Sequence, residues 1–437
     1  MAANTVPRLL LTGDLVITGE DDTLEPGFVL TAADGTIVSV SPERPAPGTF
    51  DTEMHAAVVA PGLVDIHNHG LGGSDSVLRY WMTPEFTTRR LPRHGTTGIV
   101  ATVVWDETDL ASSYAVCDRL NERCGVEGDG AVLLGVHSEG PCVATLGGLP
   151  EARGINSWDL AAFGEFVDRI GPALRLMTIS PSTDAASGYA RTRMLLERGV
   201  VPALGHDKSC SLEQIVGALR VGAAHGARLH VTHTFNVQAL HHREPGLANV
   251  ALVPSFPRTR DFAGAEPPTV EAIGDHCHVS PLALQLLLGS RSAADVVFVT
   301  DAIAEPVPGK QVAYAGLTAS VSSDGLTVGR PQADGGWLLC GSCTNLHATL
   351  VRLVNEHAVP LRDAVRLCSS NPARVARLRR GGALRPGMPC DAILLDAPPA
   401  LTLRRTLVGG RVAWDEGACV ECDGVDGEPG PWVRPDG

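Results

Sequence analysis

Eight short apolar runs alternate with stretches of helical periodicity through the middle of the chain, and this alternation restricts the fold most strongly. The clearest helix is predicted over residues 211–225, where Ser211 and Gln214 fit a capping box and apolar residues recur at helical spacing. Strands that alternate with helices form a parallel α/β sheet, and eight such units predict a (β/α)8 TIM-like barrel. The predicted strands are residues 63–67, 97–104, 132–137, 175–179, 200–205, 228–232, 273–278 and 296–300; further helices are predicted at 110–124, 159–170, 191–198 and 346–357.

Both ends of the chain have a different pattern, with short strand-like runs joined by turns. These runs are residues 8–19, 28–41, 391–396 and 405–414, and Asp34-Gly35 is a hairpin signal. We therefore expect a small β-sandwich domain built from both termini. The expected domains are residues 1–60 and 379–437 for the two parts of this β-domain, and residues 61–378 for the barrel.

Composition excludes several classes of partner. The net charge of −14 argues against nucleic acid or an anionic membrane surface as a general partner. No apolar stretch approaches the ~18 residues of a membrane helix, so we expect a cytoplasmic protein. The eleven cysteines form no small-domain framework and are expected to be mostly buried free thiols. Cys419 and Cys422 lie in a Gly/Pro-rich tail that we expect to be disordered, and their CxxC spacing is interpreted as incidental.

Ligand-type side chains follow the predicted strands at the point where each strand ends. His67 and His69 are two residues apart at the end of the first strand, so both point to one side. Chemistry in such barrels sits at the carboxyl ends of the strands. Each residue alone has an ordinary structural explanation, but together they predict a metal site. The remaining members of this set are Glu139, His206, His233 and Asp301.

This set of side chains suits metal-assisted hydrolysis. A bound divalent ion lowers the pKa of its water to about 7 and polarises a carbonyl group. A neighbouring carboxylate can take the proton from the water and pass it to a leaving amine. Asp301 closes the last strand beside the other ligands, and we expect it to have this role.

Short motifs in this order make the chain resemble the N-acetylglucosamine-6-phosphate deacetylase family of the amidohydrolase superfamily. The resemblance covers nearly the whole chain. His-x-His alone marks only the superfamily, whereas the later motifs are specific for the deacetylases. The motifs are PGLVDIHNHG (61–70), SEGP (138–141), GHDKS (205–209), THTFN (232–236), REPG (243–246), DHCHV (275–279), TDA (300–302), CGS (340–342) and NPAR (371–374).

The resemblance implies a role for each matching residue. Glu139, His206 and His233 would bind the principal metal, and His67 and His69 a second metal that only some members have. Asp301 would be the acid and base. Arg243 would reach across a homodimer interface to the phosphate in the neighbouring active site. Sugar and phosphate contacts would come from Asn236, Val237, Asp275 and His278, and a substrate loop from Cys340, Gly341 and Ser342.

The sequence departs from the family pattern near the sugar rather than near the metal. A family histidine that polarises the acetyl carbonyl is replaced by Asn156, at the end of an enlarged loop over residues 142–156. An amide still donates a hydrogen bond there, but it is a weaker electrophile. Ser138 stands where the family has leucine, and Val237-Gln238 where it has Ala-Met. These departures leave the identity of the substrate open, more than the type of reaction.

Two alternatives to deacetylation of N-acetylglucosamine 6-phosphate remain. The enzyme could act on a different or unphosphorylated N-acetylated amino sugar or amide, or the barrel could be an inert sugar-binding protein. Hydantoinase and dihydroorotase types are disfavoured, because neither Lys208 nor Lys310, the only lysines, lies at the end of the fourth strand. One or two divalent ions are expected, zinc first, while iron, manganese and cobalt suit the same ligands.

Overall fold

The computed structural model describes residues 6–19, 22–106, 109–149, 159–314, 317–332 and 335–417. Asn156, Cys419, Cys422 and most of the expected disordered tail therefore lie outside the described residues. Every cysteine within these ranges is a free thiol and most are buried, as predicted. Across the same ranges, no helix combines the length and apolar character that crossing a membrane requires.

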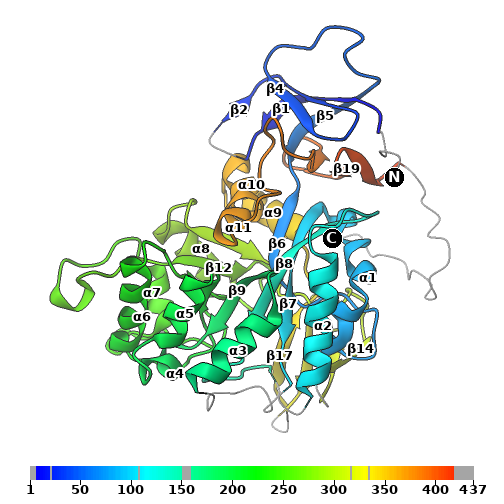
Figure 1. Cartoon of the computed structure of the whole chain (residues 1–437). Coiled ribbons are helices and arrows are strands. Elements are labelled where there is room, and N and C mark those ends of the chain that lie inside the picture. Colours follow the sequence, from blue (N-terminus) through cyan, green and yellow to red (C-terminus); the bar gives the residue numbers. More distant parts are fainter. Residues whose placement is uncertain are drawn as a thin grey trace.

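A parallel sheet of eight strands forms the centre of the described chain, with helices on its outside (Figure 1). The predicted α/β barrel is confirmed, since neighbouring strands pair in sequence order and β6 contacts β13 to close the sheet. Its strands are β6 (Leu63–Asn68), β7 (Thr96–Val104), β8 (Val132–Glu139), β9 (Leu174–Ile179), β10 (Val201–Leu204), β11 (His230–Val231), β12 (Thr269–Ile273) and β13 (Val296–Val299).

The barrel strands are continuous apolar runs in the sequence because both faces of this sheet are covered. All residues of β6, β7 and β8 are buried, because one face lines the barrel interior and the other packs against helices. The helices are α1 (Pro84–Thr88), α2 (Leu110–Arg123), α3 (Leu160–Ile170), α4 (Pro181–Ala185), α5 (Ala190–Glu197), α6 (Leu212–Ala224), α7 (Leu247–Leu252), α8 (Pro281–Ser290), α9 (Leu346–Asn355), α10 (Leu361–Cys368) and α11 (Ser370–Val375), with 3-10 turns at Val77–Met82, Leu91–His94 and Arg260–Phe262.

The predicted capping box at the start of α6 is present. The Gln214 backbone N–H donates to Ser211 Oγ at 3.3 Å, and the Ser211 backbone N–H donates to Gln214 Oε1 at 2.9 Å. These two bonds satisfy donors that the first turn of a helix leaves unpaired. The local sequence therefore sets where this helix begins.

The prediction of the seventh barrel strand was wrong in its position. The strand is β12, Thr269–Ile273, whereas most of the predicted range 273–278 forms the loop that follows it. The cause is Glu271, a fully buried carboxylate in the middle of β12 that interrupts the apolar pattern. A four-stranded antiparallel sheet after β13 was not predicted; it contains β14 (Gln311–Tyr314), β15 (Leu317–Val321), β16 (Thr327–Pro331) and β17 (Trp337–Ser342).

Strands from both chain ends share one sheet with its own hydrophobic core, as the sequence predicts. This sheet lies at the amino ends of the barrel strands, because β5 ends at Pro61 and β6 begins at Leu63 (Figure 1). Domain boundaries at residues 60 and 378 stay a prediction. The strands are β1 (Leu9–Ile17), β2 (Thr23–Leu24), β3 (Gly27–Thr31), β4 (Ile37–Ser41), β5 (Thr52–Pro61), β18 (Ala392–Leu395), β19 (Leu403–Val408) and β20 (Arg411–Asp415).

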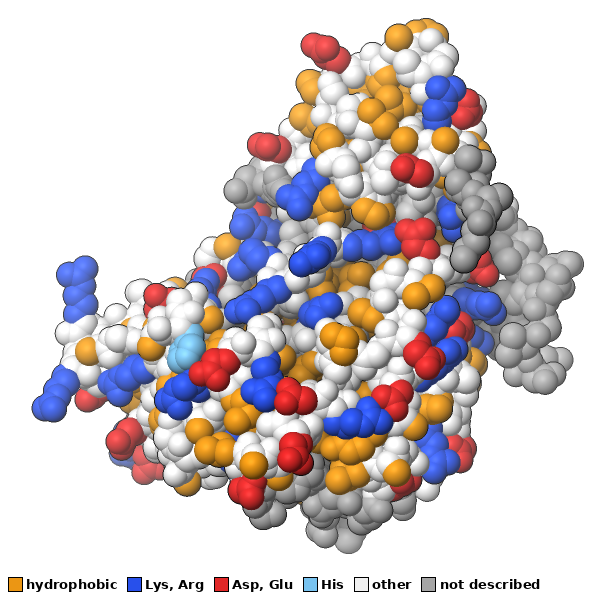
Figure 2. Space-filling model, in the orientation of Figure 1, with side chains coloured by type: hydrophobic (Ala, Val, Ile, Leu, Met, Phe, Trp, Pro, Cys, Tyr) orange, Lys and Arg blue, Asp and Glu red, His pale blue; other side chains and the backbone are white. Residues whose placement is uncertain are grey.

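The outer surface mixes the two signs of charge. Figure 2 shows acidic and basic side chains interspersed over one face of the barrel. Several are paired, for example Arg169 with Asp118 and Arg198 with Asp168. Exposed pairs of this kind contribute little to stability, so the fold depends on its interior.

Asp65 joins the first and last barrel strands. Its carboxylate accepts hydrogen bonds from the Thr300 hydroxyl at 2.6 Å, the Asn68 side-chain amide at 3.0 Å and the backbone N–H groups of His67 and Thr300, both at 3.3 Å. Asp65 is 1% exposed. The carboxylate therefore takes the place of backbone bonds where β6 meets β13.

We expect Asp65→Asn to lower the free energy of unfolding by about 2–4 kcal/mol, because an amide nitrogen would face groups that all donate. Burial raises the pKa of Asp65 from 3.8 to about 6, so the folded protein binds this proton more tightly than the unfolded chain. The contribution of this carboxyl is therefore fully present below pH 3.8 and declines as the pH rises to about 6. Urea titrations should show the difference between the proteins narrowing as the pH rises from 3.8 to about 6, and staying constant above that pH. Equal stability at every pH would contradict this assignment.

Candidate metal centre

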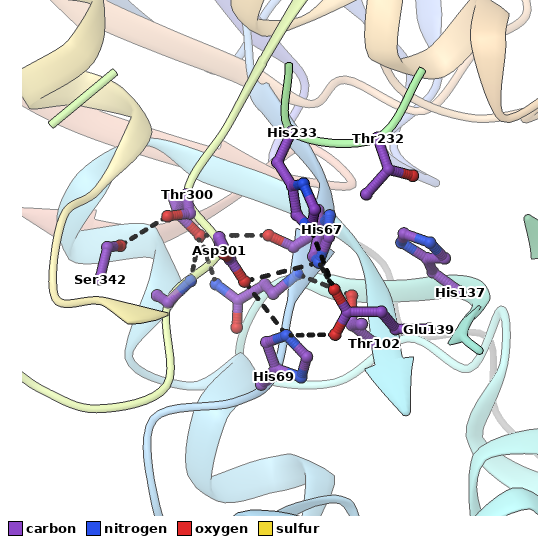
Figure 3. Close-up of polar contacts among 12 residues, drawn as sticks. His67, His69, Thr102, His137, Glu139, Thr232, His233, Thr300, Asp301 and Ser342 are labelled. Atoms are coloured by element: carbon purple, nitrogen blue, oxygen red, sulfur yellow. Dashed lines mark hydrogen bonds and ion pairs between the residues drawn. The ribbon is translucent and has the colours of Figure 1, made fainter. Parts of the chain in front are cut away.

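All the predicted metal-site side chains converge at the carboxyl ends of the barrel strands. Figure 3 shows five of them facing one another: His67, His69, Glu139, His233 and Asp301. Each of them is at least 94% buried. They come from strands far apart in the sequence, but a closed parallel barrel brings those strand ends to one mouth. His67 and Glu139 lie in β6 and β8, and the others follow β6, β10, β11 and β13: His69, His206, His233 and Asp301.

One oxygen of Glu139 is the centre of the first group. Glu139 Oε1 lies 2.9 Å from His206 Nε2, 3.2 Å from His233 Nε2 and 3.5 Å from His67 Nε2. The Nε2 atoms of His206 and His233 are 3.0 Å apart. These nitrogens point at the same small volume, as the ligands of one ion do.

The second group is built around His69 and Asp301. His69 Nε2 lies 3.1 Å from Asp301 Oδ1, and His67 Nε2 lies 3.5 Å from the same oxygen. The other oxygen of Glu139, Oε2, is 3.3 Å from His69 Nε2. The two oxygens of Glu139 therefore face different groups, and the arrangement suits two adjacent ions as well as one.

The hydrogen bonds of the outer ring nitrogens show why these residues fit a cation. His206 Nδ1 donates to the Thr145 carbonyl at 2.8 Å, and His67 Nδ1 donates to Glu271 Oε1 at 2.7 Å. In the neutral rings this leaves a lone pair on each Nε2, directed at carboxylate oxygens. His67 Nε2 is buried and has no hydrogen-bond partner. Imidazole lone pairs that face carboxylate oxygens repel them, and a cation bound between them would remove this repulsion.

The electrostatics of the site give the same result. Burial alone would lower the pKa of His67 and His206, but the carboxylates of Asp301 and Glu139 outweigh it and raise both pKa values. Burial alone would raise the pKa of Glu139 and Asp301, but the neighbouring imidazoles lower both pKa values. The site thus favours ionised carboxylates beside positive charge, which protonated imidazoles supply and which an ion bound among neutral imidazoles would supply in their place.

Three residues of this site have an unusual backbone conformation. His206, His233 and Asp301 have φ values of 50°, 27° and 50°, in the left-handed region. Non-glycine residues adopt this region at a cost of order 1–3 kcal/mol each, and such residues cluster at functional sites. The turns immediately after β10, β11 and β13 therefore direct these side chains inward.

Glu271 is the residue of this region that sequence reasoning missed. It is fully buried in β12 and contacts both His67 and His230. The strand was predicted several residues too late, so Glu271 fell outside it. The available signal was a lone acidic residue inside the short run TVEAI, beside a strand that carries a histidine.

His137 lies beneath the metal-site group as a neutral histidine. Its Nδ1 donates to the Ile66 carbonyl at 3.2 Å, its Nε2 accepts from the Thr178 hydroxyl at 2.8 Å, and its ring packs edge-on against His67. Burial lowers its pKa to about 3. His137 therefore supports the ring of His67 without carrying charge.

The predicted substrate residues do not converge on one point as the metal-site residues do. Asp275 and His278 pair with each other, His278 Nδ1 donating to Asp275 Oδ2 at 2.6 Å, which orients this imidazole at the barrel mouth. Arg243 lies on an exposed loop between β11 and α7, outside the metal-site group. Asn236 and Val237 follow His233 in the same loop, and Val237 has a φ of 54°.

The segment Cys340 to Ser342 ends against the last barrel strand. The Ser342 hydroxyl donates to the Thr300 carbonyl at 2.5 Å, and the Ser342 N–H donates to the Asp301 carbonyl at 2.9 Å. A Cβ at Gly341 would lie 2.9 Å from Ile303 Cγ2, so this approach requires glycine. These contacts place Ser342 behind Asp301 and leave the side chain of Cys340, which is half-buried, nearer the surface.

Ser138, one of the departures from the family pattern, is buried and fully hydrogen-bonded. It is fully buried, accepts a hydrogen bond from Trp105 Nε1 at 2.8 Å and donates to the Gly140 carbonyl at 2.6 Å. Its neighbour in the sequence, Glu139, points the opposite way. Ser138 therefore stabilises the turn after β8.

Comparisons with known proteins agree with this geometry. No protein-family model matches the chain. The N-acetylglucosamine-6-phosphate deacetylase of Bacillus subtilis (strain 168) is 27% identical over 93% of this chain and 97% of its own length. The N-acetylgalactosamine-6-phosphate deacetylase of Escherichia coli O157:H7 is 26% identical over 88% of this chain and 94% of its own length. A mutant N-acetyl-D-glucosamine-6-phosphate deacetylase from Mycobacterium smegmatis, solved in complex with N-acetyl-D-glucosamine-6-phosphate, has a TM-score of 0.77 and 26% identity, and the match covers 93% of this chain and all of that one.

The fold and the site together define a barrel of the metal-dependent hydrolase class. Within that class, relatives and structural neighbours that match over nearly the whole chain include N-acetylglucosamine-6-phosphate deacetylases. The resemblance predicted from the motifs is confirmed.

Removal of divalent metal should lower the melting temperature, because an ion that binds only the folded state stabilises it by about 4 kcal/mol when present at 1,000 times its Kd. Dialysis against a chelator followed by zinc addition, monitored by differential scanning calorimetry, measures this effect. Glu139→Gln should abolish the response, since this side chain contacts both groups of imidazoles.

Glu305→Gln is the matched control. Glu305 pairs with Arg90 outside the metal-site group, so this variant should respond to zinc as the wild type does. If Glu139→Gln kept the wild-type response, the metal site would have to lie elsewhere.

Proposed function

We propose that the protein is a metal-dependent deacetylase that hydrolyses the acetamide of N-acetylglucosamine 6-phosphate to glucosamine 6-phosphate and acetate. One observation carries the proposal: a chain similar over nearly its full length to such deacetylases brings all its predicted metal-site residues together in one buried group. An inert sugar-binding barrel has no need for this combination of ligands and acid-base carboxylate.

Glu139, His206 and His233 would hold the principal ion, and His67 and His69 a second one beside Asp301. A divalent ion bound there supplies a Lewis acid that polarises the acetamide carbonyl and lowers the pKa of water. Zinc is the first ion to test, since imidazole and carboxylate ligands suit it, followed by iron, manganese and cobalt.

Asp301 is the general base and acid of the proposed reaction. Its pKa is lowered, against the effect of burial, by the positive field of His67 and a hydrogen bond from His69, so it is ionised near neutral pH. In this state Asp301 Oδ1 accepts a proton from the attacking water. The same carboxyl then donates that proton to the nitrogen of the leaving amine. One residue therefore acts first as the base and then as the acid.

Asp301→Asn should lower kcat for acetate release by about 10²–10⁴-fold with little change in KM, because the amide cannot take the proton. The measurement is acetate release from a panel of N-acetyl hexosamines with and without 6-phosphate. Asp168→Asn is the control: Asp168 is an exposed carboxylate that pairs with Arg198 on the outer surface, and its loss should leave kcat unchanged. If no N-acetyl hexosamine released acetate with metal-loaded wild type, the proposal would fail.

We also propose a homodimer in which Arg243 binds the phosphate of the neighbouring subunit's substrate. Arg243 lies on an exposed loop that leads into α7, and α7 packs against α8. This region exposes large apolar side chains, with Leu282 84%, Leu286 51% and Leu240 51% exposed. Leu282 and Leu286 are one helical turn apart on α8, so they form one apolar strip that suits a second copy of the chain.

Arg243→Ala should raise KM for the phosphorylated sugar by about 10–100-fold, the value of a hydrogen bond between charged groups, and leave KM for the unphosphorylated sugar unchanged. Leu282→Glu combined with Leu286→Glu should give a monomer by light scattering and the same selective rise in KM. Arg258→Ala, at an exposed arginine on the loop before Arg260–Phe262, is the matched control and should behave as wild type. A dimer whose KM is insensitive to Arg243→Ala would remove Arg243 from phosphate binding.

A second substrate is N-acetylgalactosamine 6-phosphate, because one relative of nearly equal identity is a deacetylase of that sugar. The substitutions at Asn156 and Val237 also fall where the sugar, rather than the metal, is expected. The same substrate panel separates the two sugars by their kcat/KM values.

A further inference from the structure

Glu271 accepts hydrogen bonds from three different N–H groups at the wall of the metal-site group. Its Oε1 accepts from His67 Nδ1 at 2.7 Å and from the His233 backbone N–H at 2.9 Å, and its Oε2 accepts from His230 Nε2 at 3.0 Å. Its side chain is completely buried. Burial of a carboxylate costs free energy unless the group is paired and fully hydrogen-bonded. The three N–H donors therefore stabilise Glu271 in this position.

The shortest of these bonds determines how His67 is presented. Because Nδ1 of His67 donates to Glu271, the opposite nitrogen Nε2 carries the lone pair. That nitrogen lies 3.5 Å from both Glu139 Oε1 and Asp301 Oδ1. His67 belongs to both groups of side chains that could hold an ion. The orientation of this one ring therefore affects the whole site.

His230 completes the arrangement from the far side. It is fully buried, and its Nδ1 interacts with Thr269 Oγ1 at 2.9 Å while its Nε2 donates to Glu271. The chain Thr269, His230, Glu271 and His67 thus runs from the wall of the barrel to the ligand nitrogen. It fixes the carboxylate at both oxygens, so Glu271 cannot turn away from His67.

We propose that Glu271 is a positioning residue that holds His67 in its metal-binding orientation and thereby sets the affinity of the site for its ion. The inference rests on the proposed function, since it assumes that His67 binds metal. A glutamine in its place would present one acceptor oxygen and one donor nitrogen to groups that all donate. Either His67 or His230 would then face an N–H group and rotate.

The test measures zinc affinity by competition with a chelating indicator, together with metal content per subunit. Glu271→Gln should weaken zinc binding by about 10–100-fold, the usual effect of removing a carboxylate that holds a histidine ligand. His67→Asn should weaken it as well. The double variant Glu271→Gln/His67→Asn should be no weaker than His67→Asn alone, because Glu271 acts through that ring.

Two further variants separate positioning from a general structural role. Glu305→Gln, at a carboxylate that pairs with Arg90 outside this group, is the matched control and should bind zinc as wild type does. Glu271→Asp keeps the negative charge but is too short to reach His67 and His230 together, so it should lose affinity like Glu271→Gln. Far-UV circular dichroism of the metal-free proteins verifies that each variant is folded.

Wild-type zinc affinity in both Glu271 variants, or additive losses in the double variant, would overturn the inference. Either result can be distinguished from failure of the proposed function. A wild type that binds zinc but releases no acetate refutes the deacetylase, whereas a wild type that deacetylates while Glu271→Gln retains full affinity refutes only the role of Glu271.

Discussion

Closure of the barrel between β6 and β13 is the constraint on which the rest of the structure depends. The Asp301 N–H donates to the His67 carbonyl at 2.8 Å, and the His69 N–H donates to the Ala302 carbonyl at 2.8 Å. These two bonds place the histidine pair of the first strand beside the carboxylate of the last. The buried carboxylate of Asp65 secures the same seam from within. Without closure, Asp301 and the histidine pair of the first strand would lie at opposite edges of an open sheet.

The interior of this barrel is polar at the carboxyl ends of its strands and apolar below them. Val64, Ile66, Val100 and Leu176 belong to the apolar part, while His67 and its neighbours form the polar part. Burying so many ionisable groups would destabilise the fold if they were unpaired. Here each carboxylate lies against imidazoles, and the outer ring nitrogens of His67 and His206 donate to fixed acceptors. The same pairing that makes burial tolerable also leaves ligand nitrogens directed at one point.

Metal-site and substrate residues differ in what holds them. Glu139 and His67 are part of barrel strands, and His206 and Asp301 follow strands within one or two residues, so backbone hydrogen bonds fix their positions. Arg243 and Val237 lie on a longer loop between β11 and α7. Loops of this kind vary without disturbing the barrel. This explains why the chain departs from the family pattern around the sugar while every metal-site residue is retained.

The sequence by itself determined the alternation of strands and helices, the start of α6 and which residues are candidates for a metal site, because each depends on neighbours within a few positions. Periodicity and strand-end position are local properties, and His67, Glu139 and Asp301 could be recognised from them. Only the tertiary structure decided the position of β12 and the role of Glu271. A buried glutamate is stable only when partners far along the chain satisfy it, and His67 lies 204 residues away. Local patterns cannot contain that information, since the partner becomes a neighbour only when the barrel closes.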